Sequence, residues 1–330
     1  TIAPSPTTEP SPTTETITPP TTAPSPTSPP SPTATSTPSP TPTATPTNQP
    51  SPTFTIVPSP SPTAGPRLRP ADAMPQILIP ATTFTMGATD DDPDADDDER
   101  PAHTVTLNPY YFDQHPVTIA QYAAFLRDLP LGADHRTGCN GQRCTFTQIA
   151  TLYSHLAWDE NRDYDAVPGF EAYPISYVSW NGAQAYCAWA GARLPTEAEW
   201  ELAARGPDGH RYPWGDDPPT PDLAIYDNAG FFALGPVGAN PANVSPFGIY
   251  DLAGSLWHWT ADWYAPDYYA TSPTDNPTGP DQPPLRTLRG GAFDTPATSL
   301  RATNRFALHP IQNPVDNFVN IGFRCAQDAE

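Results

Sequence analysis

The sequence predicts an α+β fold with short twisted strands, two main helices and much irregular structure. Alternating apolar and polar residues at His103–Asp113 are typical of a strand. Helical patterns occur at Ile119–Leu129 and within Gly191–Gly206. The following stretch, Gly206–Pro246, is rich in Gly and Pro and has little periodicity. We therefore expect that stretch to be irregular but packed.

The central helix of this fold is expected within Gly191–Gly206. Thr196 is a candidate N-cap residue, and Glu199, three residues later, completes a capping box. Glu197 and Glu201 add negative charge near the helix N-terminus, where the helix dipole favours it. Gly206 is suited to end the helix.

Shorter elements are expected on the N-terminal side of this helix. Gln76–Ala88 is typical of two short strands around a turn, and Pro174–Ala190 of a short strand followed by a helix. Pro130–Phe170 is a long loop, which favours a functional or fold-specific insertion. Asp90–Glu99 carries eight carboxylates in ten positions. This composition suits a calcium loop or a solvated acidic loop, and the lack of EF-hand spacing favours the second.

The C-terminal side is rich in aromatic residues. They crowd together after Phe247, and we expect them to form core rather than a sugar-binding platform. The last strands are expected at Leu285–Phe293 and Ile321–Ala326.

The chain divides into two parts near Pro66. Residues 1–66 are a Pro/Thr/Ser segment whose only charged residues are Glu9 and Glu15. Pro lacks an amide donor and fixes φ, so we expect a disordered, extended stalk of polyproline type. Dense Ser and Thr suit an O-glycosylated stalk, and an unmodified spacer is the alternative. Residues 67–330 have globular composition and are expected to form one domain.

Charge and hydropathy exclude several function classes. The formal net charge is −21, and all 15 cationic residues are Arg. A chain this acidic is not suited to bind nucleic acid through phosphate contacts, and it has no basic stripe for an anionic membrane. No apolar run is long enough for membrane insertion. The chain starts at Thr1 without a signal peptide or anchor, so we expect a processed or truncated form.

The four cysteines favour an oxidising compartment, and so an extracellular or cell-surface location. Cys139 and Cys144 enclose a short polar loop and suit a local disulfide. Half of a zinc site is the alternative, but neither a second Cys pair nor a His pair accompanies them.

Eight collinear motifs make the globular part similar to a known family. In order, they are FTMG at Phe84–Gly87, PVTIAQYAAF at Pro116–Phe125, GARLPTEAEWELAARG at Gly191–Gly206, YPWG at Tyr212–Gly215, FGIYDLAGSLWHW at Phe247–Trp259, LRGGAF at Leu288–Phe293, LRATNR at Leu300–Arg305 and NIGFRC at Asn320–Cys325. The segment from Met74 to Ala326 resembles the sulfatase-modifying-factor family, whose founder is the formylglycine-generating enzyme. The resemblance implies a C-type-lectin-like fold and a disulfide between Cys187 and Cys325.

The resemblance also implies an oxidase, but this chain departs from the family at the residues that carry the chemistry. The family's enzymes convert a sulfatase cysteine to formylglycine with two cysteines that bind copper. Those cysteines lie between an RGG strand, here Arg289–Gly291, and an R-x-x-x-R element, here Arg301 and Arg305. The segment between them, Ala292–Leu300, contains no cysteine. Copper(I) needs soft sulfur ligands, so we expect neither copper nor oxidase activity.

Structural calcium is a further implication of the resemblance. One family site uses an Asn after the YPWG segment, which Asn228 matches, and a turn-capping role for Asn228 is the alternative. A second site lies in a G-N-V-W-E-W motif, which corresponds to GSLWHW at Gly254–Trp259. Ser255 replaces the Asn and His258 the carboxylate, which should weaken calcium binding there.

The region of the family's substrate pocket is a candidate ligand surface for a protein or small molecule, bound without catalysis. Fixed-looking and variable-looking positions alternate there, as in retroelement-diversified lectin-fold proteins, and ordinary sequence drift is the alternative. Two other functions stay open: a formylglycine-generating oxidase, and a structural or sensor domain of a larger surface receptor. The candidate residues are Phe293, Asp294, Thr295, Thr298, Ser299, Arg301, Arg305, Phe306, Leu308, His309 and Phe318.

Overall fold

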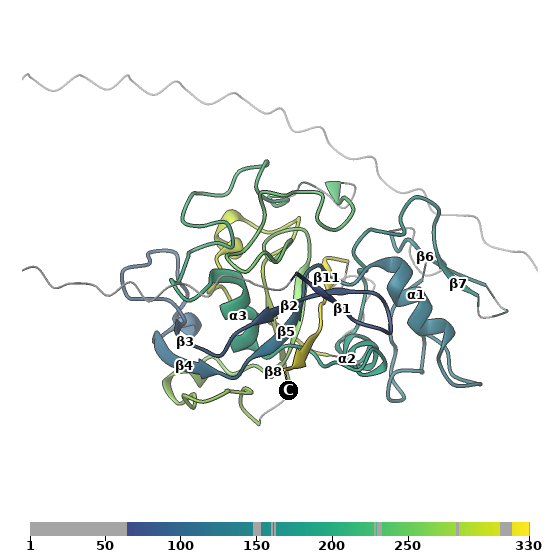
Figure 1. Cartoon of the computed structure of the whole chain (residues 1–330), viewed down its shortest axis with the longest axis horizontal. Helices are drawn as coiled ribbons and strands as arrows, with labels where there is room; N and C mark the ends of the chain where they lie inside the picture. The colour runs from purple at the N-terminus through teal and green to yellow at the C-terminus, as the bar shows by residue number, and fades with distance from the viewer. Residues whose placement is uncertain are drawn as a thin grey trace, which may run out of the picture. The chain divides into compact units, whose positions relative to one another are not determined.

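The computed structural model describes residues 65–147, 153–159, 161, 163–227, 229, 233–281, 284–310 and 319–329, which lie in one structural unit (Figure 1). Its first sheet has four antiparallel strands in the order β1–β2–β5–β12. Arg67, in the first of these strands, donates a hydrogen bond to Gln327 in the last. The four strands span Arg67–Leu68, Pro75–Ile79, Tyr110–Asp113 and Ala326–Asp328.

The second sheet has the order β10–β9–β8–β11. β11 runs parallel to β8, and the other two pairings are antiparallel. The RGG strand, β9, therefore lies beside the strand that follows the R-x-x-x-R element, β10, which is at the edge of the sheet. In sheet order, the four strands span Phe306–Leu308, Arg286–Arg289, Trp257–Trp263 and Ile321–Gly322.

Two further pairs of strands form ribbons. β3 (Thr82–Met86) pairs with β4 (His103–Leu107), so the two strands predicted within Gln76–Ala88 exist but pair in different sheets. β6 (Leu156–Trp158) pairs with β7 (Tyr164–Ala166) inside the segment predicted to be a long loop. That prediction was incomplete, because strands of three residues are too short to show alternation. Figure 1 shows the two ribbons at opposite ends of the unit.

Three α-helices, rather than two main ones, are present in the described residues: α1 (Ile119–Arg127), α2 (Trp180–Trp189) and α3 (Glu197–Arg205). The predicted capping box of α3 is confirmed, because the Thr196 side chain accepts a hydrogen bond from the Glu199 amide and the Glu199 side chain accepts one from the Thr196 amide. The predicted stop at Gly206 is also confirmed, since its φ of 68° is favourable for glycine. Short 3₁₀ helices lie at Asp97–Glu99, Tyr268–Ala270 and Ala297–Leu300.

The core has two main apolar clusters. One joins α1 and α2 to the second sheet through residues such as Tyr122, Tyr186 and Trp259. The other packs α3 against the first sheet and the β3–β4 ribbon, with Trp200 and Phe112 at its centre. The prediction that the aromatic residues after Phe247 form core is confirmed for Trp257 and Trp259, which are 4% and 0% exposed.

Both expected disulfides are present. Cys139 bonds to Cys144, and Cys187 bonds to Cys325 across a sequence separation of 138 residues. The second bond ties α2 to the segment between β11 and β12. The zinc alternative for Cys139 and Cys144 is therefore wrong.

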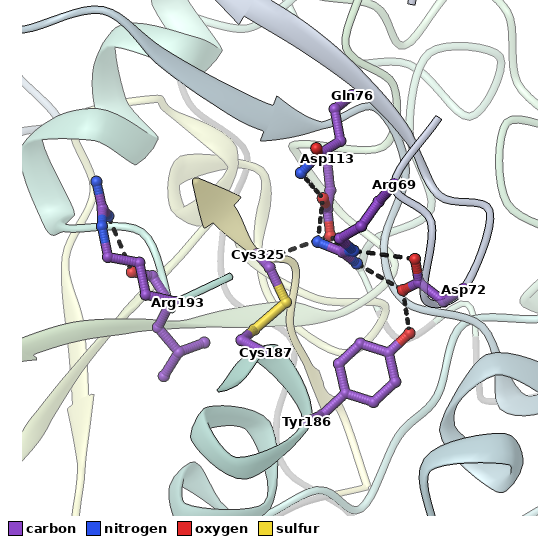
Figure 2. Close-up of a disulfide and its surroundings, with 9 residues drawn as sticks. Arg69, Asp72, Gln76, Asp113, Tyr186, Cys187, Arg193 and Cys325 are labelled. Carbon is purple, nitrogen blue, oxygen red and sulfur yellow. Dashed lines mark hydrogen bonds and ion pairs between the residues drawn. A yellow bond between two sulfur atoms is a disulfide. The ribbon is translucent and has the colours of Figure 1, made fainter. Parts of the chain in front are cut away.

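A buried ionic cluster lies beside the Cys187–Cys325 bond (Figure 2). The guanidinium of Arg69 lies between the carboxylates of Asp72 and Asp113, at 2.6 and 2.8 Å. Asp113 also accepts a hydrogen bond from the Cys325 amide, and Asp72 accepts one from the Tyr186 hydroxyl. The start of the domain is thus joined to α2 and to the C-terminal strands at one place.

The acidic segment Asp90–Glu99 is organised by arginines. Arg100 donates hydrogen bonds to the carbonyl oxygens of Ala95 and Asp92, each at 2.8 Å. Arg211 pairs with Asp94. Glu99 is fully buried, so the prediction of a solvated acidic loop is wrong for this residue.

Candidate functional site

The segment after β9 begins with two glycines that its path requires. Gly290 and Gly291 have φ values of 101° and 71°. A Cβ atom at Gly290 would lie 2.5 Å from the Leu252 carbonyl oxygen. This backbone turn, which other residues could not adopt without strain, directs the chain from the RGG strand into Ala292–Leu300.

Arg301 and Arg305 point inward from this segment. Arg301 makes two hydrogen bonds to the carboxylate of Glu99, at 2.6 and 2.7 Å. Arg305 makes two to the carboxylate of Glu197, at 2.8 and 3.0 Å. The two arginines are only 1% and 5% exposed, so their assignment to the ligand surface needs correction. Their guanidinium groups hold the segment in place.

Arg289 completes this set of arginine anchors. It is fully buried, forms an ion pair with Glu201 and donates to the carbonyl oxygens of Ala302, Thr303 and Asn304. Burial alone would raise the pKa of Glu197, but Arg305 and Arg289 outweigh burial and hold that pKa below its ordinary value. We call Arg289, Arg301 and Arg305 the arginine anchors.

Several other candidate residues also brace the segment. Phe293 is 6% exposed and packs with Leu234 and Leu256. Asp294 accepts two hydrogen bonds from the Asn320 amide group, at 2.9 and 3.1 Å. The Thr295 hydroxyl caps a local turn at Ala292.

The remaining candidate residues differ in exposure. Thr298 is exposed, whereas Ser299, Leu308 and His309 are half-buried. Phe318 and the calcium candidate Asn228 lie outside the described residues.

Phe306 is the exposed residue of the edge strand β10. Its side chain is 42% exposed and stacks on Trp257, with ring centroids 5.2 Å apart. Phe306 pairs with Leu288, and Leu308 with Arg286. Because residues two apart on a strand share a face, Phe306, Leu308 and Arg286 lie on the same side of the sheet.

Arg286 lies between two indole rings on this side. Its guanidinium carbon is 3.7 Å from the Trp180 ring centroid and 3.3 Å from that of Trp263. The two rings are nearly parallel, at 16°. Burial lowers the pKa of Arg286 to about 10, an effect that Asp262 opposes, so the group stays cationic at neutral pH.

We call Phe306, Leu308, Arg286 and Trp263 the rim surface, and Trp180, which is 7% exposed, is its buried support. Phe306 and Leu308 were predicted from the sequence, whereas Arg286 and both tryptophans were not. Trp180 and Trp263 are 83 positions apart, as their numbers show, so only the tertiary structure brings them together. For Arg286, the one local signal in the sequence was its place on a predicted strand, two residues before Leu288.

No thiol is available for copper chemistry at this site, because all four cysteines of the chain are bonded in disulfides. Cys139 and Cys144 are fully buried between α1 and α2. The Cys144 carbonyl oxygen accepts hydrogen bonds from the Ser179 amide and the Tyr122 hydroxyl. The two cysteines of this loop are therefore part of the core, whereas Asn140 and Gly141 at its tip are exposed.

Among the described residues, no cluster of three or more His, Cys, Asp or Glu side chains is arranged to hold a metal ion. Likewise, no helix in the described ranges is long and apolar enough to cross a membrane. The second calcium motif lies apart from the rim, around His258, which is 1% exposed.

Comparison with models of known protein families shows which family the chain belongs to. Residues 62–329 match the model of the sulfatase-modifying factor enzyme 1-like domain. The chain belongs to this family. The family resemblance and the C-type-lectin-like α+β fold expected from the motifs are thereby confirmed.

Two relatives of similar identity carry names that differ in activity. The chain is 34% identical to the formylglycine-generating enzyme of Streptomyces coelicolor, over 77% of this chain and 90% of that protein. It is also 34% identical to the inactive C-alpha-formylglycine-generating enzyme 2 of Mus musculus, over 77% of this chain and 85% of that protein.

Solved structures agree with this fold. PvdO from Pseudomonas aeruginosa superimposes with a TM-score of 0.63 and 25% identity, over 82% of this chain and all of that one. Treponema denticola variable protein 1 gives a TM-score of 0.51 and 19% identity, over 78% of this chain and 95% of that one. The second likeness concerns the fold alone.

Proposed function

We propose that this chain is a non-catalytic, ligand-binding member of the family, displayed outside the cell on its Pro/Thr/Ser-rich segment. The rim surface takes the ligand, and the arginine anchors hold the rim in place. Two buried disulfides and the composition of residues 1–66 support the extracellular location.

The rim surface is the observation that carries this proposal. Aromatic and Arg side chains are enriched in the energetically important parts of protein interfaces. Phe306 presents an exposed ring on a buried support, Trp257. The two indole rings hold the guanidinium of Arg286 in one orientation, which reduces the entropy lost when it pairs with a carboxylate.

The chemistry of the cysteines supports a non-catalytic role. The family's oxidase reaction needs two thiolates that bind copper(I), and the side chains of Ala292–Leu300 offer only hydroxyl and carboxylate oxygens. Relatives with opposite activities in their names share the same 34% identity with this chain. Overall identity therefore does not predict activity, and the residues of the site must do so.

The net charge indicates what kind of partner reaches the rim. A chain with a formal net charge of −21 attracts partners whose surfaces are basic. We therefore propose a protein ligand with a basic surface, an apolar group that packs on Phe306 and a carboxylate that pairs with Arg286.

Selection of peptides from a displayed library on the wild-type protein tests this proposal. We expect the selected peptides to lose at least about tenfold in affinity for Phe306→Ala and Arg286→Ala, the size of a hot-spot contact. Leu131→Ala is the matched control, because Leu131 is fully exposed and outside the rim. Equal binding of the peptides to all three variants would show that the rim is not the binding site.

Mass spectrometry tests the non-catalytic part separately. Purified protein with copper is incubated with a sulfatase-type cysteine peptide, and we expect no aldehyde product. Aldehyde formed by the wild type and lost in the Cys139→Ser/Cys144→Ser variant would overturn this part of the proposal.

A further inference from the structure

The motif around His258 borders a cavity of about 250 Å³. The polar side chains that line it belong to Asn240, Asn243, Asp251, Ser255 and His258, and the walls include Ile225 and Leu256. Family resemblance implies calcium at this motif, so the donors around the cavity decide whether this chain suits that ion.

The negative charge at the cavity is low. Asp251 is the one carboxylate among the lining residues, and one of its oxygens accepts a hydrogen bond from the Gly238 amide at 2.6 Å. The guanidinium of Arg324 donates to the carbonyl oxygens of Tyr250 and Asp251, each at 2.9 Å. A fixed positive charge therefore lies on the same turn as the one carboxylate. Calcium sites instead gather six to eight oxygen ligands with an excess of negative charge.

His258 presents nitrogen where calcium requires oxygen. Its ring is buried on β8, and its Nδ1 atom accepts a hydrogen bond from the Trp200 Nε1 group of α3 at 3.4 Å. This contact holds the imidazole against the helix. Imidazole suits borderline transition metals rather than hard cations, and no third His, Cys or carboxylate joins it among the described residues.

Asn243 provides a further side-chain oxygen, in addition to those of Asn240 and Ser255. Its amide group donates to the Ala253 carbonyl oxygen at 2.7 Å, and its Oδ1 atom is buried without a partner in the described part of the chain. A buried acceptor of this kind is normally satisfied by ordered water, and the cavity is large enough for several water molecules.

We infer that this cavity holds water instead of calcium, and that His258 is the residue that determines this difference. A carboxylate at position 258 would offset the charge of Arg324 and supply up to two further oxygen ligands. In wild type, the His258–Trp200 hydrogen bond connects β8 to α3 in place of a metal ion.

Calcium-dependent stability of the wild type and of two His258 variants tests this inference. Thermal unfolding of the full chain is compared in EDTA and in about 1 mM calcium. This concentration equals the upper end of the Kd range of extracellular calcium-binding modules. We expect the same midpoint in both for wild type and for His258→Gln. His258→Glu should gain a calcium-dependent rise of about 3–6 °C if it binds with a Kd of about 0.1 mM.

Terbium luminescence, sensitised by the nearby tryptophans, measures binding directly. Asp251→Asn is the additional variant in this experiment. A wild-type calcium or terbium response that persists in Asp251→Asn comes from elsewhere in the chain and agrees with the inference. A wild-type response that Asp251→Asn removes would overturn it, as would a folded His258→Glu protein that binds no calcium. If His258→Glu does not fold, the comparison of wild type with Asp251→Asn still decides.

Discussion

The guanidinium of Arg305 faces the carboxylate of Glu197 in a buried pair with two hydrogen bonds. Arg305 immediately precedes the exposed Phe306, so this pair fixes the backbone from which the rim surface begins. The backbone position of the rim surface therefore depends on a buried ionic contact.

Breaking this pair should destabilise the domain strongly. Arg305→Met leaves the buried Glu197 with Arg289, at 3.6 Å, as its one cationic partner among the described residues, and we expect a loss of about 3–5 kcal/mol in the free energy of unfolding. Urea unfolding monitored by tryptophan fluorescence measures this loss.

The control for this prediction is Arg136→Met. Arg136 pairs with Asp134 at the surface, where the two side chains are 52% and 27% exposed, so its loss should cost less than about 1 kcal/mol. In the double variant Glu197→Leu/Arg305→Met, much of the stability should return, because no buried charge is left unpaired. Equal effects of Arg305→Met and Arg136→Met would contradict the anchoring role.

The capping box of α3 and the ionic partners of the same helix show what could be predicted from sequence. Thr196 and Glu199 are three residues apart, so local spacing was enough. Glu197 binds Arg305 across 108 positions, and Glu201 binds Arg289 across 88. A glutamate in the first turns of a helix looks the same in sequence whether it faces solvent or a buried guanidinium.

The residues of the candidate site also divide into those that the sequence predicted and those that only the tertiary structure shows. Motif order located the segment around Ala292–Leu300 and the exposed Phe306. Whether an Arg in that segment points inward depends on the acidic loop, because Glu99 receives Arg301 from 202 positions away. The Arg286 stack needed three elements to meet, and no sequence pattern records that meeting.

The long-range disulfide should contribute more to stability than the local one. Cys187 and Cys325 are separated by 138 residues, and Cys139 and Cys144 by 5. The chain-entropy relation gives about 5 and about 2 kcal/mol for these two loops. Paired Cys→Ser variants, unfolded in urea, check the order, and a larger loss for Cys139→Ser/Cys144→Ser would contradict it.

Stability should fall as the pH is lowered from 6.5 to 4. Burial lowers the pKa of His135 from 6.5 to about 4, an effect that Asp134 opposes. In this window the unfolded chain binds a proton at His135 that the folded state does not, so protons favour unfolding. His135→Gln should reduce this loss, and the partly exposed His103→Gln is the matched control. Thermal midpoints measured across the window test it, and identical slopes for wild type and His135→Gln would count against it.

Gly182→Ala should destabilise the domain although alanine favours helices. A Cβ atom at this position of α2 would lie 2.0 Å from the Cys144 carbonyl oxygen. The disulfide loop would have to move, which we expect to cost about 1–3 kcal/mol despite a gain of about 1 kcal/mol in helix propensity. Asn181→Ala, at the neighbouring helix position, should stay within about 0.5 kcal/mol of wild type in urea unfolding. A Gly182→Ala protein more stable than wild type would show that the loop is not packed on the helix.

Limited proteolysis should leave residues 67–330 as one resistant fragment. The prediction follows from the change in composition near Pro66, because a segment rich in Pro, Thr and Ser cannot bury enough apolar surface to fold. Mass spectrometry of the products identifies the cut sites. Early cleavage within 67–330, before any cleavage in 1–66, would disagree with the two-part organisation.

The hydrogen bond between Arg67 and Gln327 has a practical consequence for protein engineering. The Arg67 side chain reaches across the sheet from β1 to β12, the two edge strands, which are three strand spacings or about 14 Å apart, so a linker of several residues can connect residues 65 and 329. Such a circular permutant could open the chain at Leu131, which is fully exposed, without cutting a helix or strand. The same geometry suits insertion of the whole domain into a surface loop of a carrier protein.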